Sequence, residues 1–537
     1  MALLGIDLGT TAVKALLITE SGETLASATV EYPLSTPQPL WSEQDPSDWW
    51  RGSVEAIRQV LGKSSIPGSA VRAIGLSGQM HGLTLLDRDG RVLRPAILWN
   101  DQRTAAQCQA MIERAGGPAR MRALATNLPN PSYTAPKLLW VREHEPHLYA
   151  RIAHVLLPKD YIRYKLSGEF ATDVGDATGM ALLDVRRRTW SDELLRLFDI
   201  PRAWLPLCAE SHVVTARVSQ AAAQETGLAA GTPIVGGSGD QPAAAVGLGS
   251  VREGIVNVTL GTSGVVFASV EHYPQMQDTA IELFCHAVPE TWFLMGVMLS
   301  AGGSLRWHRD VIANGHPALA SVNHNGDAYD ALLSSAATVP IGAEGLIFLP
   351  YLTGERTPHR DPLARGAFVG LTLRHTQAHL ARAVVEGISF GLRDSIELMR
   401  ALGLKVSEVR AAGGGARSAV WRQMLADIFE ADITLVNSTE GGAFGVALLA
   451  GVGIGLWRDT REACDAVIRV TSRTAPSEDS AVRAHYAEAY ARYREAYPAL
   501  KPLFSRLCRC QNVGSLLRAA HGAPRSRPVW SPARASA

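Results

Sequence analysis

The sequence has few of the features that mark secreted, membrane-spanning or nucleic-acid-binding proteins. It contains six cysteines in 537 residues, and no Cys-x-x-Cys pair occurs. No uncharged apolar run reaches the roughly 18 residues that a membrane helix requires, and the N-terminus lacks the basic segment of a signal peptide. The formal net charge is only +1, which argues against a broad nucleic-acid-binding face. We therefore expect reduced thiols and a cytoplasmic protein with no nucleic-acid or membrane partner.

The length and the order of the motifs indicate two domains. A chain of 537 residues is longer than one hydrophobic core usually supports. Its 47% hydrophobic and 19% charged residues are typical of globular proteins. Apolar strands and glycine turns recur in the same order in both halves, and the segment 71–75 is matched by 409–413. This repetition predicts an internal duplication, with domains at 1–250 and 251–505.

The second half ends in helices and a basic tail. Apolar residues spaced by four predict a buried helix over 376–400. Four tyrosines at helical spacing between 486 and 497 predict a closing helix that packs on the core, and we expect Pro498 to end it. Residues 506–537 contain six arginines and no lysine, aspartate or glutamate. We predict that this tail is mostly disordered.

Two loops about 250 residues apart share a Gly-Thr-(Thr/Ser) turn after an apolar strand. They are Gly9-Thr10-Thr11 and Gly261-Thr262-Ser263. Such turns present backbone N–H groups and hydroxyls to the oxygens of a phosphate. Only the first loop follows an acid, Asp7, which suits a magnesium ion that bridges phosphates. One such turn is usually structural, but its repetition in two halves predicts a nucleotide site.

A third glycine-rich bend carries an acid at the predicted domain junction. The segment 236–239 leads into Asp240 and Gln241. A carboxylate in this position can accept the proton of a substrate hydroxyl that attacks phosphorus. The alternative is an aspartate that only caps a turn. The two predicted phosphate loops favour the catalytic interpretation.

Two further segments offer side chains that suit a polyhydroxy substrate. Gln79-Met80-His81 brings an amide, a thioether and an imidazole to the end of a strand, although a lone loop histidine is more often structural. Trp99-Asn100-Asp101 combines an aromatic wall with polar groups. The same three residues also suit the start of a helix, with the asparagine or the aspartate as its cap. Both interpretations of this segment can hold together.

The glycine run Gly413-Gly414-Gly415 precedes a predicted helix near Ser418. Glycine backbone lets a flat ring such as a nucleoside base lie close against it. A plain strand-to-helix turn explains the same residues equally well.

At these residues the chain resembles the FGGY family of carbohydrate kinases, from residue 3 to about 504. The motifs that carry the resemblance occur in order: GIDLGTT, SGQMHG, LWNDQR, SYTAPKLLWVREH, GGSGDQPAAAVG, LGTSG and GLIFLPYLTGERTPHRDPLARGAFVGL. The resemblance implies an α/β fold of two actin-like (ribonuclease-H-like) ATPase domains with an interdomain cleft. It also implies that ATP and Mg²⁺ serve the phosphorylation of a small ketose, D-xylulose, and it suggests a homodimer.

The resemblance further implies a role for individual residues. Asp240 is the expected catalytic base, and Asp7 is the expected magnesium ligand and second catalytic residue. The expected nucleotide-binding set is Thr10, Thr11, Lys14, Gly261, Thr262, Gly302, Gly414 and Ser418. The expected substrate-binding set is Gln79, Met80, His81, Trp99, Asn100, Asp101 and Gln241.

Three other functions remain open at the level of sequence. A few pocket atoms decide whether such an enzyme accepts ribulose, an alditol or a deoxysugar instead. The actin-like fold also serves chaperones and filaments, and fold alone does not decide between them. A non-catalytic sugar sensor is the third alternative, but we would expect such a protein to have lost Asp7 or Asp240.

Overall fold

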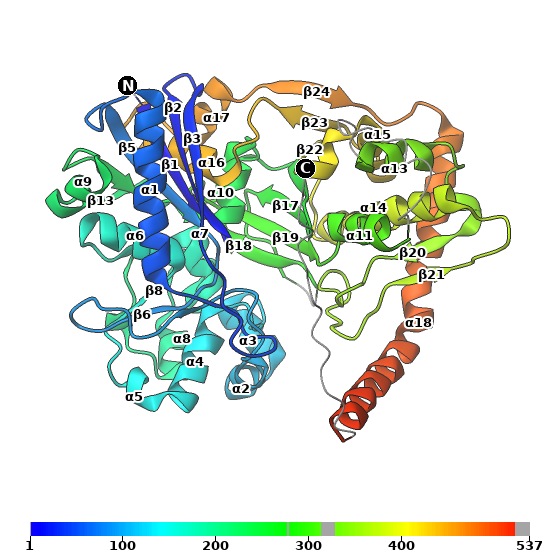
Figure 1. Ribbon diagram of the computed structural model, residues 1–537, viewed down its shortest axis with the longest axis horizontal. Coiled ribbons are helices and arrows are strands. Elements are labelled where there is room, and N and C mark those ends of the chain that lie inside the picture. The colour runs from blue at the N-terminus through cyan, green and yellow to red at the C-terminus, as the bar shows by residue number, and fades with distance from the viewer. Residues whose placement is uncertain (1, 277–278, 313–327, 521–537) are drawn as a thin grey trace, which may run out of the picture.

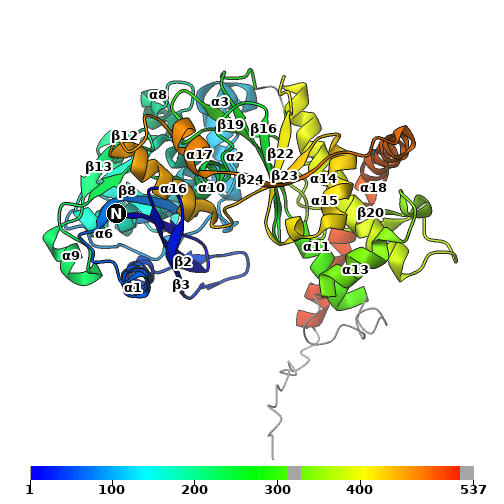
Figure 2. The ribbon, with the colours of Figure 1, turned by 90° about the horizontal axis from the view of Figure 1, so that it is seen from above.

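The computed structural model describes residues 2–276, 279–312 and 328–520. These residues form two α/β halves, each built around a mixed sheet of seven strands. In Figure 1 the first half lies on the left, in blue and cyan, and the sheet of the second half lies towards the right. Figure 2 shows the same two lobes from above.

The first sheet has the strand order β13-β14-β5-β1-β2-β3, with β15 beside β5. β1 pairs antiparallel with β2 and parallel with β5, and β2 pairs antiparallel with β3. β1 is buried on both faces along nearly its whole length, and β2 is buried at most of its positions, as expected for inner strands of a covered sheet. The strands are β1 (Ala2–Leu8), β2 (Ala12–Thr19), β3 (Thr24–Glu31), β5 (Val71–Gly78), β13 (Val214–Arg217), β14 (Pro233–Val235) and β15 (Ser238–Gly239).

Helices and short two-stranded sheets complete the first half. Pro46 begins the longest of these helices, and Asp45 caps it by accepting a hydrogen bond from Ser47 N. The helices are α1 (Pro46–Ser64), α2 (Ala105–Arg114), α3 (Pro118–Ala125), α4 (Thr134–His144), α5 (Pro146–Tyr149), α6 (Pro158–Ser167), α7 (Val174–Ala177), α8 (Asp192–Phe198), α9 (Gln220–Thr226) and α10 (Asp240–Gly247). The short strands are β4 (Glu43–Gln44), β6 (Thr84–Leu86), β7 (Ala96–Ile97), β8 (His154–Leu156), β9 (Ala171–Asp173), β10 (Leu183–Asp184), β11 (Thr189–Trp190) and β12 (Leu207–Ala209).

The second sheet has the order β18-β19-β17-β16-β22-β23-β24. β16 pairs antiparallel with β17 and parallel with β22, which repeats the arrangement of β1 with β2 and β5. The two sheets therefore agree with the internal duplication that the sequence predicts. The strands are β16 (Ile255–Leu260), β17 (Gly264–Val270), β18 (Glu282–Cys285), β19 (Trp292–Met298), β22 (Glu408–Ala412), β23 (Ile433–Val436) and β24 (Val470–Thr474).

The remaining elements of the second half include the helix expected over 376–400. It is present as α14, which buries its apolar face in the core of this half. The elements are α11 (Gly302–Trp307), α13 (Ala328–Ala337), β20 (Ile347–Leu349), β21 (Ala367–Val369), α14 (Gln377–Ala401), α15 (Ala419–Phe429), α16 (Gly441–Gly453), α17 (Thr460–Val467) and α18 (Ser480–Ala520).

Helix α16 joins the two halves. It lies between β23 and β24 of the second sheet in the chain but packs on β1 and β5 of the first sheet and on α10, and Figure 1 shows it within the left lobe. Its sequence is apolar on all sides, as expected for a helix covered all round. Gly5 makes the approach close enough, since a Cβ there would lie 1.8 Å from Ala443 O.

The predicted end of the last helix is wrong. α18 runs from Ser480 to Ala520 and contains Pro498 and Pro502. A proline removes one backbone hydrogen bond and normally bends a helix, but Tyr497 and Phe504, on either side of these prolines, are both buried. Packing thus holds the chain helical beyond Pro498. The disorder expected for residues 506–537 stays a prediction, and residues 521–537 lie outside the described part of the chain.

Across the described residues, no helix combines the length and the apolar character needed to cross a membrane.

Candidate active site

The first Gly-Thr turn lies at the end of β1 and is held by side chains from around it. Tyr32 donates its hydroxyl hydrogen to Gly9 O. Gln44 Nε2 donates to Thr10 O at 2.6 Å, and Trp99 Nε1 donates to Thr10 Oγ1 at 2.9 Å. Thr11, the next residue, is exposed. These three hydrogen bonds fix the turn, and they leave the Thr11 hydroxyl exposed, where a ligand can contact it.

A charged pair connects this turn to the other half of the chain. Lys14 on β2 forms an ion pair with Glu440, the residue before α16. Both side chains are partly exposed, so the Lys14 ammonium stays within reach of an anion at the turn. Sequence analysis identified Lys14 but not its partner, because the two residues are more than 400 positions apart.

Asp7 is a partly buried carboxyl group at the same edge of the sheet. Its neighbours in the strand register are Lys14 on β2 and Ser77 on β5, and the Ser77 hydroxyl donates to Asp7 Oδ1. Burial raises the pKa of Asp7, while the Ser77 hydrogen bond and the Lys14 charge lower it. A Cβ at Gly442 would lie 3.1 Å from Asp7 Cγ, so the start of α16 closes over this carboxyl group.

Asp240 is the first residue of α10. It directly follows β15, which pairs with the end of β5. Burial raises its pKa to about 7, and the negative charge of Asp7 adds to the increase. Hydrogen bonds from the backbone and side chain of Gln241 act in the opposite direction. The structure therefore brings Asp7, Asp240 and Gln241 together, as predicted. A carboxyl group with a pKa near 7 is suited to accept and release a proton at neutral pH.

The second Gly-Thr turn is supported by backbone hydrogen bonds from its own half. Gly302 N donates to Gly261 O at 2.9 Å, and Ala301 N donates to Thr262 O at 3.0 Å. A Cβ at Gly302 would lie 2.5 Å from Gly261 O, so only glycine permits this contact. The predicted residues Gly261 and Thr262 thus lie directly against Gly302, the first residue of α11.

The glycine run that begins at Gly413 lies against the end of β16. Gly413 has a φ of +85°, and a Cβ there would lie 2.6 Å from Leu260 O. Around Gly414 a Cβ would meet nothing within 4 Å, which leaves open space above the backbone. Ser418 accepts a hydrogen bond from Trp421 N and caps α15. Both predicted residues therefore lie beside the second turn, and Ser418 also has a local structural role.

The strand end at 78–81 is buried. Gln79 Nε2 donates to Gln44 Oε1 at 3.0 Å, and Met80 lies under Gly239, where a Cβ would be 2.6 Å from Met80 Cγ. His81 has a φ of +69° and its Nδ1 lies 3.1 Å from Gly179 O. Burial lowers the pKa of His81 to about 3, so its ring is neutral.

The segment that begins at Trp99 divides between the two interpretations given above. Trp99 is exposed and Asn100 is half-buried, and both line a cavity between the halves. Asp101 is fully buried instead and accepts hydrogen bonds from Ser42 N at 2.7 Å and from the Arg103 guanidinium. Its oxygens hold the local turn together. Neither Asn100 nor Asp101 caps a helix as expected, because α2 begins at Ala105 and Thr104 occupies its cap position.

The cavity between the halves has a volume of about 880 Å³. Side chains from both halves line it. One of them, Glu282, forms hydrogen bonds with residues of both halves. Asn130 Nδ2 and the Tyr133 hydroxyl donate to Glu282 Oε1, at 3.1 and 2.9 Å, and Arg356 pairs with Glu282 Oε2. The ring of Tyr133 lies 4.9 Å from that of His81. The cavity therefore adjoins the buried strand end at one side and the first turn, through Trp99, at another.

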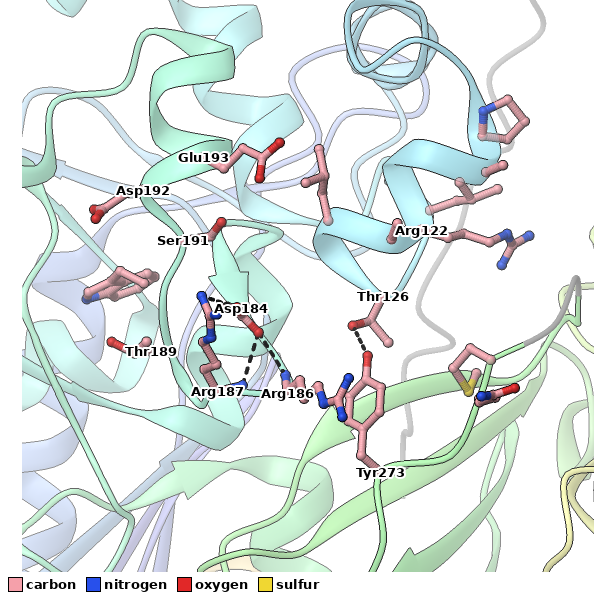
Figure 3. A pocket seen from close by; sticks show the side chains of 18 of the residues that line it. Arg122, Thr126, Asp184, Arg186, Arg187, Thr189, Ser191, Asp192, Glu193 and Tyr273 are labelled. Atoms are coloured by element: carbon pink, nitrogen blue, oxygen red, sulfur yellow. Dashed lines mark hydrogen bonds and ion pairs between the residues drawn. The ribbon is translucent and has the colours of Figure 1, made fainter.

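A larger cavity of about 1360 Å³ lies away from both turns, between α3, α8 and the loop that contains Tyr273 (Figure 3). The Thr126 and Tyr273 hydroxyls are 2.7 Å apart across it. Asp184 accepts hydrogen bonds from the backbone N–H groups of Arg186 and Arg187. Neither Gly-Thr turn contributes to its lining, so its chemistry is separate from that of the two carboxyl groups.

A buried cluster of charges beneath Asp240 escaped the sequence analysis. Lys159 Nζ lies 2.6 Å from Asp160 Oδ1, 3.0 Å from Asp173 Oδ1 and 3.4 Å from Asp176 Oδ2. Burial raises the pKa of Asp176, and the Asp240 charge contributes to the increase. Adjacent Lys159 and Asp160 were the only sign of this cluster in the sequence, and they gave no indication of burial.

Comparisons with known proteins agree with this geometry. Family models described as the FGGY family of carbohydrate kinases match residues 2–247 (N-terminal domain) and 256–454 (C-terminal domain). A xylulose kinase from Escherichia coli is 44% identical over 450 residues, which are 84% of this chain and 89% of the relative. A xylulose kinase from Klebsiella pneumoniae is 41% identical over 503 residues, 94% of this chain and 100% of the relative. The crystal structure of a xyloylose kinase from Brucella ovis matches with a TM-score of 0.86 and 38% identity, covering 94% of this chain and 100% of that one.

Proposed function

This chain belongs to the FGGY family of carbohydrate kinases, and we propose that it transfers the γ-phosphoryl group of ATP to D-xylulose, with D-xylulose 5-phosphate and ADP as products. Its two-domain α/β fold is the actin-like ATPase fold of the solved kinases that it matches. One observation carries the proposal for the site. The carboxyl groups of Asp7 and Asp240 lie beside the first Gly-Thr turn, close enough that one raises the pKa of the other.

Asp240 acts as the general base in this proposal. It accepts the proton of the terminal hydroxyl while that oxygen forms a bond to the γ-phosphorus. The bond between the γ-phosphorus and the bridging oxygen breaks, and ADP leaves. A pKa of about 7 keeps the carboxyl group ready to accept a proton near neutral pH, and a positioned base contributes roughly 10²- to 10⁴-fold to the rate.

The two Gly-Thr turns hold the phosphates of ATP. Thr10, Thr11 and Thr262 offer hydroxyls, and Lys14 offers an ammonium group that the Glu440 ion pair keeps at the rim. Gly261 and Gly302 bring backbone close to the phosphates. Gly414 and Ser418 lie beside the second turn, where open space above Gly414 suits the nucleoside. Phosphoryl transfer needs this positioning more than it needs covalent chemistry.

A magnesium ion fits the residues at the first turn. The partly buried Asp7 carboxyl group has one hydroxyl donor and a pKa that burial raises, so a cation beside it would stabilise its charged form. No cluster of three or more histidines, cysteines or acids suited to a metal occurs in the described residues. Mg²⁺ commonly binds through one or two carboxylates plus substrate phosphates rather than through such a cluster. When bound, it would offset the negative charge of the phosphates.

We propose fewer residues that contact the acceptor substrate than the sequence predicted. Trp99 and Asn100 line the cavity between the halves, and Met80, His81 and Gln241 surround the approach to Asp240. We assign Gln79 to positioning, because its amide is bonded to Gln44. The homodimer and the cytoplasmic location stay predictions.

ADP release from the purified protein with MgATP tests the proposal, with D-xylulose, D-ribulose, xylitol, gluconate and glycerol as separate acceptors. We expect the highest kcat/KM with D-xylulose. A higher kcat/KM with another acceptor would keep the mechanism and change the substrate. ATP binding without release for any acceptor would contradict the kinase assignment and favour a sensor.

A further inference from the structure

Glu355 is a buried acid that the proposed mechanism leaves unused. It lies in the segment between β20 and β21, is 2% exposed and lines the cavity between the halves. Its Oε1 accepts hydrogen bonds from Leu299 N at 3.0 Å and from Arg356 N at 2.8 Å. Its Oε2 is buried and has no hydrogen-bond partner within the part of the chain that the structure describes. A buried polar atom without a partner costs stability unless a ligand or water supplies one.

The other acid of this cavity differs from Glu355. Both oxygens of Glu282 are engaged, by Tyr133 and Asn130 on one side and by Arg356 on the other. Glu282 therefore serves as a structural connection between the halves. Glu355 lines the same cavity, and its buried Oε2 still lacks a partner, which makes it the acid of this wall that a bound molecule could satisfy.

The protonation state of Glu355 defines what kind of contact it can make. Burial raises its pKa to about 8, and the charge of Asp394 adds to the increase. The carboxyl group is then mostly protonated at neutral pH. Because Oε1 already accepts two N–H groups, the proton resides on Oε2. The cavity thus contains an O–H donor that needs an acceptor oxygen.

We propose that Glu355 is a specificity-determining residue whose Oε2–H donates a hydrogen bond to an oxygen of the polyhydroxy acceptor, at the end that is not phosphorylated. This inference rests on the proposed function, since it takes the cavity to hold the sugar. The reacting hydroxyl must lie at Asp240, which belongs to the first half and does not line this cavity. Glu355, from the second half, contacts the other end of the sugar.

If Glu355 contacts the acceptor, residues from both halves of the chain take part in binding it. Trp99, Asn130 and Ser132 line the cavity from the first half, and Glu355 and Arg356 line it from the second. A sugar that bridges these walls favours the arrangement in which the halves are close. Glu355 further holds Leu299, which precedes the turn bonded to Gly261 and Thr262. Acceptor recognition and the second phosphate turn therefore share one side chain.

The pH dependence of acceptor binding separates this role from a purely structural one. Ionised Glu355 would still accept both backbone hydrogen bonds but would lose its O–H donor. Charged groups that line the cavity or act on Glu355 are Arg122, Glu282, Arg356, Arg360, Arg365 and Asp394. The arginines stay charged, and the pKa of Asp394 is about 6. The Tyr351 and Tyr493 hydroxyls feel the charge of Glu355, but burial holds their pKa values well above 10. Glu355 itself titrates near pH 8. Asp240, at the reacting hydroxyl, has a pKa of about 7, and its share of the pH dependence is common to the wild type and to the variants compared below.

The test is the dissociation constant of D-xylulose, measured by calorimetry on the full chain without nucleotide, at about pH 7 and about pH 9. For the wild type we expect roughly three- to tenfold weaker binding at the higher pH, the range of one net hydrogen bond. Glu355→Gln keeps an acceptor oxygen and places an N–H donor at the Oε2 position. We expect this variant to bind as the wild type does near pH 7 and to weaken less than the wild type at pH 9, because only the contribution of Glu355 is removed.

Glu386→Gln is the matched control. Glu386 is another buried glutamate of the second half, it is bonded to Arg382 and Gly342 N, and it does not line the cavity. We expect its pH dependence to follow the wild type. Equal pH dependence in the wild type and in Glu355→Gln would overturn the inference alone. A wild-type protein that binds no D-xylulose at either pH would instead contradict the proposed function.

Discussion

The two Gly-Thr turns share a strand arrangement but differ in charge. In the first, Asp7 on β1 lies beside Lys14 and Ser77 in the strand register. In the second, the equivalent position on β16 is Thr259, with Val265 and Ala412 beside it. The first turn is braced by side chains, Gln44 and Trp99, whereas backbone bonds from Ala301 and Gly302 brace the second. The duplicated scaffold thus supplies two similar turns, and in the proposed function only the first serves the acid–base and metal chemistry.

The position of α16 contributes to this difference in charge between the two turns. Its N-terminal end brings Glu440 to Lys14 and Gly442 to Asp7, so the second half of the chain completes the charged turn of the first. Neither turn is a complete site by itself. Separate expression of either half would therefore remove part of the charged site.

The largest effect on turnover should come from Asp240, the proposed general base. We expect Asp240→Asn to reduce turnover by roughly 10²- to 10⁴-fold, because the proton acceptor is lost while the shape is kept. ATP affinity, measured by calorimetry, should stay close to the wild-type value. Asp199→Asn, at an exposed helix end, should turn over normally. Wild-type turnover in Asp240→Asn would show that another group takes the proton.

The next largest effect on turnover should come from Asp7, whose equivalent position in the second half is Thr259. We expect Asp7→Ala to lower turnover by roughly 10²- to 10³-fold, the range for removal of one preorganised electrostatic group, and to raise the magnesium concentration needed for half-maximal rate. Thr259→Ala should change both quantities little. Similar losses in the two variants would break the contrast between the turns, and so would an unchanged magnesium titration in Asp7→Ala.

The pH–rate profile measures the same contrast without substitution. The ionised form of Asp240 is the active base, so kcat/KM should fall as pH decreases through about 7, by about tenfold per unit below it. The raised value arises first from burial and then from the charge of Asp7. In Asp7→Ala, the residual activity should therefore titrate at lower pH. A profile that stays flat between about pH 5 and about pH 7 would contradict the assignment.

A smaller effect, on stability, should follow from the crossing of α16 over β1. We expect Gly5→Ala to lower the free energy of unfolding by about 1–3 kcal/mol, because the new Cβ would overlap Ala443 O. Gly62→Ala, in α1 with open space around it, should raise the same quantity by about 0.4–1 kcal/mol. Denaturant unfolding of both variants measures these values. Equal stabilities would show that α16 is not packed against β1.

The smallest effect should come from the C-terminal end. Removal of residues 506–537 should leave turnover unchanged, because Phe504 is the last large side chain known to be buried. A marked loss would assign this segment a part in the site or in an assembly.

Local motifs predicted the parts of the site that are contiguous in sequence. Asp7 with its turn, Asp240 with Gln241, and Gly261 with Thr262 each lie within one strand–turn unit, where glycine and hydroxyl residues reveal the backbone. Distant partners could not be predicted in the same way. The ion pair of Lys14 with Glu440 and the contact of Gly5 with α16 depend on packing between the halves. Pro498 was misread as a helix end because packing around Tyr497 and Phe504 outweighs its local preference. The burial of Asp101 involves Ser42, 59 positions earlier in the chain, and a local motif does not reveal it.

The central claim is that one ATP, held between two unlike turns, gives its γ-phosphoryl group to the terminal hydroxyl of D-xylulose at Asp240. Phosphorus NMR of a reaction with MgATP and D-xylulose tests it most directly. We predict one new phosphate monoester, on the terminal carbon, that forms in equal amount with ADP in the wild type and is nearly absent with Asp240→Asn. Formation of inorganic phosphate without a sugar phosphate, or equal product from both proteins, would contradict the account.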